Sequence, residues 1–412
     1  MSQQVPANEP AINRPPVTAD VAPPTAGVES GSGQIRIGSL RIQTATLRAY
    51  TLVFALAVIW IVFHYKTGGT FLGADNFSNL LKQSAVTGIL AVGMLMVIVT
   101  GQIDLSVGSV LGLAGGVAAL VQGWGLLPSL AVAILVGLVI GTLQGTLVAY
   151  ANIPAFIVTL GGMLAWGQNG LTYRMLSGTS IKLNLPGYEA IGLQYVAPSA
   201  GIAMAILAIL FIVWLNLSRN RARRRRNLTV PGMGATIARI ALPSVLILVF
   251  IYAMNKQGGI PISVFIMLIV ALAGAFLTQN TTFGRYLYAI GGNPDAARLS
   301  GINLRRRLLL TFCIMGALAG VAAIVQNGIQ GSAMLTAGNN LELNAIAACV
   351  IGGTSLMGGR GTVFGAILGA LIMQSLDNGM SLLNFENYLQ FIVKGTVLVA
   401  AVGIDMLGRR RT

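Results

Sequence analysis

Apolar runs separated by short polar breaks fill the chain from about residue 49 to residue 406. Most runs are about 17 to 22 residues long, which matches the helical length that crosses the hydrocarbon core of a bilayer. The pattern predicts an all-α, polytopic integral membrane protein with about 10 to 12 transmembrane helices. The runs are placed near residues 49–65, 84–100, 107–122, 129–150, 153–173, 199–217, 237–254, 260–278, 308–326, 341–357, 361–380 and 388–406.

Two of the breaks are very short and contain glycine. They lie at 101–106 and 358–361, so some spans are predicted to be broken or re-entrant. The strings GQIDLSVGSVLGLAGG and GGTSLMGGRGTVFGAILGA both run from a glycine-rich break into a small-residue helix. This similarity hints at an internal repeat of the kind common in transporters. Gly361, Gly365 and Gly369 are spaced four apart, which predicts a helix face suited to close packing.

Composition and charge support a membrane protein over a soluble globule. Hydrophobic residues make up 55% of the chain and charged residues only 9%. The net charge of +15 comes from arginines that cluster beside apolar runs rather than among aromatic residues. A lipid surrounding explains this placement better than a nucleic-acid partner, and no nucleic acid is expected.

The chain divides into a tail, a membrane domain and a basic end. Residues 1–46 are rich in Pro, Ala, Ser, Gln and Thr and have no apolar periodicity, so they are predicted to be a disordered cytoplasmic tail. Residues 47–406 form the transmembrane domain, with a cytoplasmic loop at 281–307. Residues 407–412 form a basic cytoplasmic C-terminus. The tail lacks the charged-then-apolar order of a cleaved signal peptide, so the first apolar run is expected to be retained.

Arginine placement predicts the orientation. With the N-terminus inside the cell, the run Arg219–Arg226, the loop 281–307 and Arg409–Arg411 all fall inside, after six, eight and twelve spans. Because cytoplasmic loops carry the excess of positive charge, both termini are predicted to be cytoplasmic. The loops assigned to the outside keep only scattered charges, at Lys66, Lys82, Arg174, Lys182 and Lys256.

The loop 281–307 contains a short helix whose two ends are both signalled. Asn293 is a good N-cap, Pro294 suits the first helical position, and Asp295 complements the positive end of the helix dipole. Gly301 supplies a C-terminal stop. A capped helix in a basic loop between spans is suited to docking a cytoplasmic partner, although a helix that only covers the span ends has the same pattern.

Three side chains of this helix are candidates for partner contacts. Arg298 is placed to meet an acidic group on a partner, and Ala296 and Ala297 offer a small packing surface.

Few polar residues interrupt the apolar runs, and each is a candidate for the transport path or for a structural break. Asp104 lies between two runs, where an ionised carboxylate is costly unless it meets water, a partner or a helix end. Ser106 follows it, so Asp104 can cap the next helix. A role in fixing a broken helix and a role in contacting cargo are both open. Asn152 is expected to serve in a turn before Pro154.

Three further polar residues lie in the last third of the chain. Glu342 is expected at the outer membrane edge, and Asp377 with Asn378 at the outer end of the eleventh span. They form a polar mouth, or they cap helices.

The sequence offers no catalytic or metal constellation. It has one histidine, His64, and Cys313 and Cys349 lie in apolar contexts typical of buried small side chains. No G-x-x-x-x-G-K-[ST] string is present, so ATP and Mg²⁺ would have to be bound by a partner. The chain is therefore predicted not to be an enzyme, and neither a cofactor nor a metal is expected in it.

Four strings together resemble a known family: TGILAVGMLMVIVTGQIDLSVGS, IPAFIVTLGGMLA, GRYLYAIGGNPDAARLSGIN and NAIAACVIGGTSLMGGRGTVFGAILGA. In this order, over residues 76 to 405, they are similar to the membrane permease of bacterial ABC sugar importers of the ribose/xylose type. SNLLKQSAVTGILAVGM, SLDNGMS and the long segment 186–260 resemble the xylose-type members, because ribose-type members are shorter through that segment. The tail and the RARRRR run lie outside the resemblance.

The resemblance implies a function and a set of partners. Such permeases pair as dimers in the inner membrane, dock on a cytoplasmic ATP-binding subunit and receive a monosaccharide from a periplasmic binding protein. D-xylose is the expected sugar, with another aldose of the ribose, arabinose or glucose type as the alternative. The family's coupling helix corresponds to Gly292 to Gly301, which contains the helix deduced above from its caps.

Two other classes of membrane protein share parts of this pattern. A secondary transporter would also have broken helices, but it needs membrane-embedded titratable groups for ion coupling, and here only Asp104 clearly qualifies. An intramembrane enzyme would need a catalytic constellation that the sequence does not offer.

Overall fold

The computed structural model describes residues 34–37, 40–230 and 232–409, and the chain divides into two compact units between Leu47 and Arg48. In the first unit, strands β1 (Gln34–Ile37) and β2 (Leu40–Gln43) pair antiparallel, with Gln34 opposite Gln43. This stretch was assigned to a disordered tail, so that assignment does not hold for it. Residues 1–33 lie outside the described residues, and for them disorder stays a prediction.

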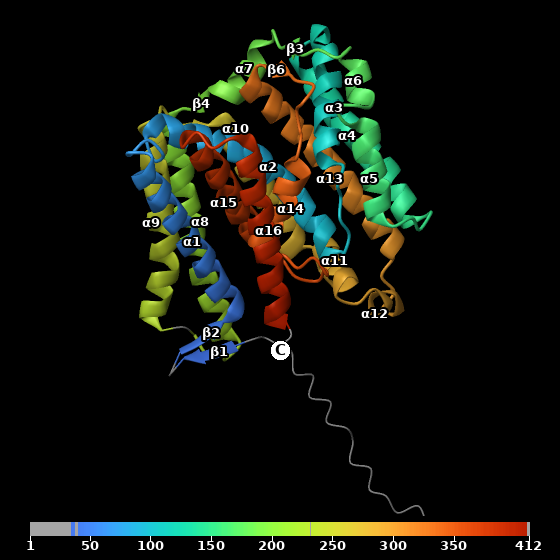
Figure 1. The fold of residues 1–412 in the computed structure, drawn as a ribbon. Helices are drawn as coiled ribbons and strands as arrows, with labels where there is room; N and C mark the ends of the chain where they lie inside the picture. The colour runs from blue at the N-terminus through green and yellow to red at the C-terminus, as the bar shows by residue number, and fades with distance from the viewer. Residues whose placement is uncertain (1–33, 38–39, 231, 410–412) are drawn as a thin grey trace, which may run out of the picture. The chain divides into compact units, whose positions relative to one another are not determined.

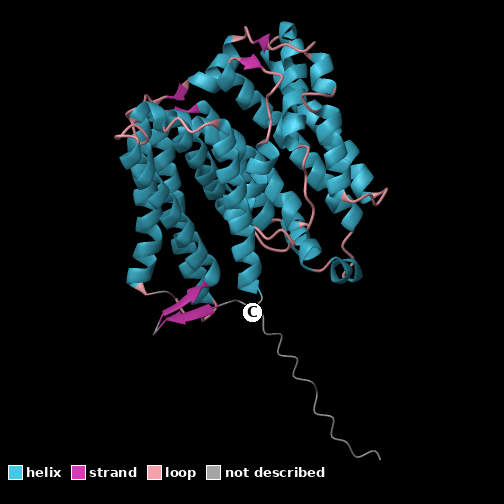
Figure 2. Ribbon diagram, viewed as in Figure 1, coloured by secondary structure: helices cyan, strands magenta, loops and turns pink. Residues whose placement is uncertain are grey.

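Helices make up nearly all of the second unit (Figures 1 and 2). Short two-residue strands pair at the end opposite α12: β3 (Ile181–Lys182) with β6 (Ser332–Ala333), and β4 (Tyr195–Val196) with β5 (Ile260–Pro261). The helices are α1 (Thr44–Lys66), α2 (Ala74–Val99), α3 (Val107–Leu120), the 3-10 turn η1 (Gln122–Trp124), α4 (Leu126–Ala149), α5 (Ala155–Trp166), α6 (Leu171–Met175), α7 (Pro186–Leu193), α8 (Pro198–Arg225), α9 (Met233–Asn255), α10 (Ile262–Asn280), α11 (Thr282–Gly292), α12 (Pro294–Leu299), α13 (Leu304–Gln330), α14 (Leu341–Ile351), α15 (Val363–Leu382) and α16 (Asn387–Arg409).

Each apolar run found in the sequence contains a helix, so the predicted all-α polytopic class is confirmed. Seven helices among the described residues are long and apolar enough to cross a bilayer. Three of the predicted spans are helical over only part of their length: α3 has 14 residues, α5 has 12 and α14 has 11. A full crossing needs about 20 helical residues, so these three are partial helices, as the glycine-containing breaks suggested for α3 and α14.

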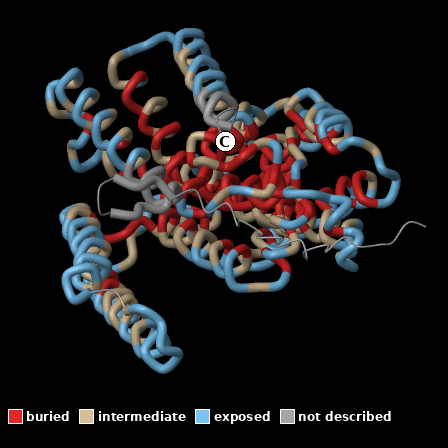
Figure 3. The backbone as a smooth tube through the Cα atoms, turned by 90° about the horizontal axis from the view of Figure 1, so that it is seen from below, coloured by how far each residue is buried: buried red, intermediate tan, exposed pale blue. Residues whose placement is uncertain are grey.

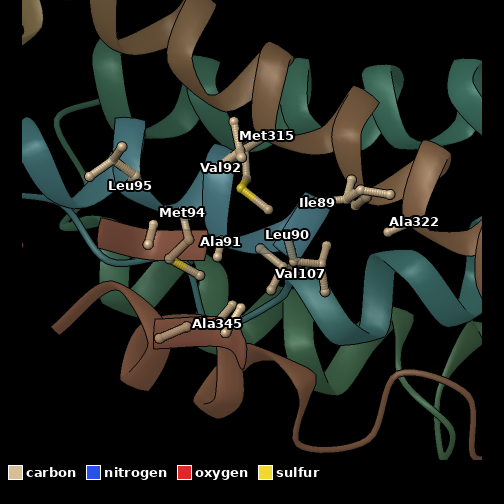
Figure 4. Packing of buried hydrophobic residues seen from close by; sticks show 14 of the residues in the cluster. Ile89, Leu90, Ala91, Val92, Met94, Leu95, Val107, Met315, Ala322 and Ala345 are labelled. Carbon is tan, nitrogen blue, oxygen red and sulfur yellow. The ribbon is translucent and has the colours of Figure 1, made fainter. Parts of the chain in front are cut away.

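Helix α2 is the centre of the packing. From Leu80 to Val99 every residue but Gln83 is buried, and α10, α13, α14 and α15 all pack against it. Figure 4 shows Ile89 to Leu95 of α2 against Met315 and Ala322 of α13 and Ala345 of α14. Figure 3 shows buried positions concentrated around this region, with mostly exposed helices toward the left of the view.

The sequence placed the start of this span too late. Because α2 begins at Ala74 rather than near residue 84, Lys82 does not lie in an outside loop but inside the helix, only 7% exposed. Its ammonium group lies 4.7 Å from the centroid of the Tyr195 ring, whose hydroxyl pairs with Ser78 at 3.0 Å. The cation-π contact compensates for part of the cost of burying this charge.

Glycines let several helices cross at backbone contact. A Cβ at Gly137 of α4 would overlap the Gly316 carbonyl oxygen of α13, and the converse also holds. On α15, a Cβ at Gly365 or at Gly369 would overlap a backbone oxygen of the α14 side. The predicted helix face is thus confirmed for Gly365 and Gly369 as the α14–α15 contact. Gly361 precedes α15, and a Cβ there would meet Leu95 and Thr354 instead.

Helices α8 and α9 form a hairpin that packs mainly on itself. Only Gly201 and Ala205 of α8, and Ile251 and Met254 of α9, are buried. All four lie toward the β4–β5 end of the hairpin. The basic last turn of α8, Arg223 to Arg225, lies at the same end of the unit as α12 (Figure 1).

Candidate functional site

Two broken spans meet inside the second unit. The chain leaves α2, runs without helix through 100–106 and starts α3, while a second non-helical stretch, 334–340, descends from β6 to the start of α14 (Figure 1). The two helix starts touch: a Cβ at Gly108 would overlap the Gly338 carbonyl oxygen and the Glu342 carboxylate. The site therefore combines two helix N-termini, each of which favours negative charge.

Asp104 holds the first break in place. Its Oδ1 accepts hydrogen bonds from the Ser106 backbone N–H at 2.8 Å and from the Ser106 hydroxyl at 2.7 Å. Gln144 of α4 donates from Nε2 to the same hydroxyl oxygen at 2.9 Å, and all three side chains are buried. These contacts explain how a carboxylate is accommodated between apolar spans. They favour a role for Asp104 in fixing the broken helix over a role in contacting cargo.

Glu342 belongs to the same region, and its expected place at the outer membrane edge stays a prediction. It lies in the first turn of α14 with 8% of its surface exposed. The first turn of α3 packs against it, because Gly108 leaves room there. A glutamate in an apparent loop gives no sequence signal that it packs against the start of another helix, so its burial could not be read from the spacing.

A polar hollow of about 240 Å³ opens beside Glu342. The C-terminal end of α5 contributes Met163 and Leu164 as its apolar wall. Two contacts fasten the lining: Ser109 Oγ donates to the Met163 carbonyl oxygen at 2.9 Å, and Asn339 Nδ2 donates to Gln168 Oε1 at 2.7 Å. The polar lining side chains are Ser109, Gln168, Asn169, Asn339, Asn340 and Glu342.

Sequence reasoning missed all of these lining residues except Glu342. Gln168 and Asn169 lie in WGQNG and Asn339 and Asn340 in AGNN, both of which read as ordinary turns. The available signal was the brevity of the apolar stretches beside these turns, 155–166 and 341–351, each too short to cross a bilayer alone. Irregular backbone at membrane depth is tolerated where it is buried in protein or lines a cavity.

The other residues predicted for the path lie elsewhere. Asn152 occupies the exposed turn between α4 and α5 with φ 55°, as expected of a turn residue. Asp377 forms an ion pair with Lys394 of α16, at 3.0 Å. Asn378 exchanges amide hydrogen bonds with Asn76, at 2.8 and 2.9 Å. These contacts fasten α15 to α16 and α2, and Lys394 was not singled out from the sequence.

The short helix predicted near residues 294–300 is present as α12, with the predicted caps. Asn293 Oδ1 accepts a hydrogen bond from the Ala296 N–H at 3.0 Å, Pro294 takes the first position, and Gly301 follows with φ 79°. Asp295 lies in the first turn, where it complements the dipole.

The two alanines of α12 do not share a surface, contrary to the sequence interpretation. Ala297 is buried at 4% exposure, whereas Ala296 and Arg298 face outward. The side chain that stands out is Leu299, 89% exposed, more than any other large hydrophobic side chain described. An exposed leucine next to Arg298 offers a partner an apolar contact with a positive charge beside it.

Comparison with known proteins agrees with a transport role. Residues 76–402 match the family model described as "Branched-chain amino acid transport system / permease component". The chain belongs to this family of membrane transport permeases, and its class is therefore that of a multi-pass permease rather than of an enzyme.

Particular relatives are more similar still. The chain is 42% identical to the xylose transport system permease protein XylH of Haemophilus influenzae, over 89% of this chain and 98% of the relative. It is 41% identical to XylH of Escherichia coli K12, over 96% and 99%. With the ribose import permease protein RbsC of Escherichia coli K12 the identity is 35%, over 81% and 87%. No solved structure matches the chain.

Proposed function

We propose that the chain is the membrane subunit of an ATP-driven importer in the bacterial inner membrane, with D-xylose as its substrate. The observation that carries this proposal is the identity of 41–42% with xylose permeases along 89–96% of the chain, against 35% with a ribose permease along 81%. Another aldose is the alternative substrate. A cytoplasmic subunit supplies the ATP and Mg²⁺ site, a periplasmic protein delivers the sugar, and two copies of this chain pair.

The coupling element of the importer is α12. Its caps make it a rigid short helix. Gly292 and Gly301 flank it, and because they lack a Cβ they leave the backbone on either side free to set its angle. Leu299 and Arg298 form the outward face, an apolar anchor with an adjacent cation, while buried Ala297 ties the helix to its own chain. A partner with an apolar pocket and an acidic rim fits this face, and its movement would be passed through α12 to α11 and α13.

The direct test is uptake by vesicles that contain the permease, its ATP-binding subunit and the sugar-binding protein. We expect ATP-dependent uptake of xylose in preference to ribose, arabinose and glucose. The structure contains more buried ionisable side chains than the sequence suggested, namely Lys82, Asp104 and Glu342. A second arm therefore omits ATP and applies a proton or sodium gradient, and uptake in that arm would favour a secondary transporter instead.

Leu299→Asp tests the coupling face. Removing a central apolar anchor and placing a negative charge in an apolar pocket with an acidic rim costs about 2 kcal/mol or more, so association with the ATP-binding subunit should weaken at least about thirtyfold. Because Leu299 touches little of its own chain, permease abundance should stay normal. Leu299→Met is the matched control and should associate normally. Equal pull-down of the ATP-binding subunit by the Asp and Met variants would contradict the proposed role of α12.

We also propose that the α12 end of the unit faces the cytoplasm, because the arginine-rich end of α8 lies at that end. Both termini are proposed to be cytoplasmic on the arginine placement in the sequence. In a cysteine-free background, a membrane-impermeant thiol reagent added to intact spheroplasts should label Asn184→Cys and miss Ala222→Cys. Both positions are exposed, so accessibility does not bias the comparison. The reverse labelling pattern would invert the orientation.

A further inference from the structure

We propose that the hollow between α3, the end of α5 and the start of α14 is a binding site for the hydroxyl groups of one monosaccharide, a waypoint inside the permease itself. The inference rests on the proposed function, since it takes an aldose as the cargo. It goes beyond it by assigning the contacts to particular residues: Glu342, Gln168, Asn339 and Ser109.

The hydrogen-bonding capacity of the lining fits a polyol. Each sugar hydroxyl donates one hydrogen bond and accepts others, so its site needs acceptors and donors side by side. The bond from Asn339 Nδ2 to Gln168 Oε1 uses one group of each amide. Among the described residues, no protein partner is recorded for the other two groups, Gln168 Nε2 as donor and Asn339 Oδ1 as acceptor.

Glu342 and Ser109 add two acceptors. The Glu342 carboxylate lines the hollow although only 8% of the residue is exposed. Hydrogen bonds to a carboxylate are stronger than those to neutral acceptors. The Ser109 hydroxyl donates its hydrogen bond to the Met163 carbonyl oxygen, so its own oxygen remains able to accept one. Among the described residues, no cation lies beside this buried carboxylate. A neutral ligand with many hydroxyl donors would therefore supply its hydrogen bonds.

The size and the walls of the hollow select for a small ligand. Its volume of about 240 Å³ is on the scale of a single five-carbon sugar rather than of an oligosaccharide. Met163 and Leu164 offer an apolar surface to the C–H faces of the ring. Binding there has to be weak, because a transport site must release what it takes up.

A ligand-protection experiment tests the site without relying on transport rates. Cys313 and Cys349 are replaced by serine, and Asn169→Cys introduces an exposed thiol at the edge of the hollow. The permease complex in detergent or nanodiscs is alkylated with a hydrophilic maleimide at increasing xylose concentrations. We expect the alkylation rate to fall and level off, reaching half its initial value at a concentration in the millimolar range.

Two controls make the protection specific. Asn184→Cys, an exposed position on the loop before α7, should be alkylated at a rate that xylose leaves unchanged. Adding Glu342→Gln to the Asn169→Cys protein should abolish protection at the same xylose concentrations, whereas adding Ser84→Ala should not. Ser84 is equally buried, but its hydroxyl bonds within its own helix, to the Leu80 carbonyl oxygen.

The outcomes separate the site from the function. If the unmodified complex imports xylose but Asn169→Cys is alkylated equally fast with and without sugar, the waypoint is wrong and the proposed function stands. If protection survives Glu342→Gln, the assignment of the carboxylate as a sugar ligand is overturned. A complex that imports no aldose overturns the proposed function, and the site with it.

Discussion

Helix α2 and the α8–α9 hairpin are built from apolar segments of similar length and end up in opposite surroundings. In the most apolar stretch of α2, 94% of the residues are buried inside the unit, against 11% for α8 and 11% for α9. The more hydrophobic helices are the exposed ones. In a soluble protein this order would be reversed, because burial away from water would favour the most apolar helix.

The contrast shows what sorts helices inside a bilayer. Lipid tails are as apolar as leucine, so hydrophobicity does not drive one helix onto another, and small or polar side chains decide the contacts. Gly88 and Gly93 of α2 lack a Cβ, and the sulfur atoms of Met267 of α10 and Met315 of α13 pack in the space this leaves. Ser84 and Thr87 of α2 are buried in the same region. The outward positions of α8 carry large groups such as Leu207, Phe211 and Trp214, all more than half exposed.

The largest expected effect comes from adding volume where helices cross at backbone contact. Gly316→Val would drive two methyl groups into the Gly137 carbonyl of α4, and neither backbone can retreat as a side chain could. Overpacking costs about 1–3 kcal/mol in ordinary cores and more where backbone is the obstacle. We expect little folded protein in a thermal-shift or gel-filtration assay.

The matched change in the hairpin should be harmless. Leu210→Trp also adds volume, but Leu210 is 58% exposed, so the larger ring extends into lipid. Similar melting temperatures for the two variants would show that the two regions do not differ in packing as the structure indicates.

Much of the fold could be predicted because its signals are local. The apolar runs, the caps of α12 at Asn293 and Gly301, and the glycine spacing of α15 each lie within a few neighbouring residues. Helix burial is different, since it depends on which helices meet. The same local reading misjudged the start of α2, and with it Lys82, because the polar residues of its first turns look like a loop.

The candidate site was only half predictable for the same reason. Asp104 and Ser106 are only two residues apart in sequence, so their mutual hydrogen bonds could be anticipated. Glu342 approaches them only because the chain re-enters between β6 and α14, and the amide pair of Gln168 and Asn339 joins residues 171 positions apart. On α12, the sequence could not tell which alanine faces the protein, so it named both Ala296 and Ala297 and overlooked Leu299.

The second prediction concerns a polar group within the buried region. Asp104→Leu removes the acceptor that holds the Ser106 N–H and hydroxyl, so the break before α3 loses its defined geometry. Hydrogen bonds to charged groups are worth about 1.5–3 kcal/mol, so uptake should fall at least about tenfold. Insertion and abundance should stay normal, since a charge is removed from apolar surroundings.

Asp104→Asn is the control for this change. It keeps an acceptor oxygen and should retain most of the uptake. If the Leu variant is expressed normally and transports like the wild type, Asp104 is a bystander and the polar break does not distinguish the core from the hairpin functionally.

The smallest effect is expected from removing the hairpin altogether. Strands β4 and β5 pair antiparallel with Val196 opposite Ile260, so the two chain ends left by deleting 197–259 already lie side by side. An Asn-Gly turn can join them, because two-residue turns of this kind connect antiparallel strands. Two spans are lost together, so the orientation of everything that follows is preserved.

The energetic cost of that deletion should also be small. Four hairpin residues are buried, and the surfaces they cover would meet lipid rather than water. We expect the shortened protein to insert, to bind the ATP-binding subunit and to import sugar within about threefold of the full chain. A shortened protein that is stable but inactive would show that the exposed hairpin takes part in transport, and that lipid exposure is a poor guide to dispensability in this permease.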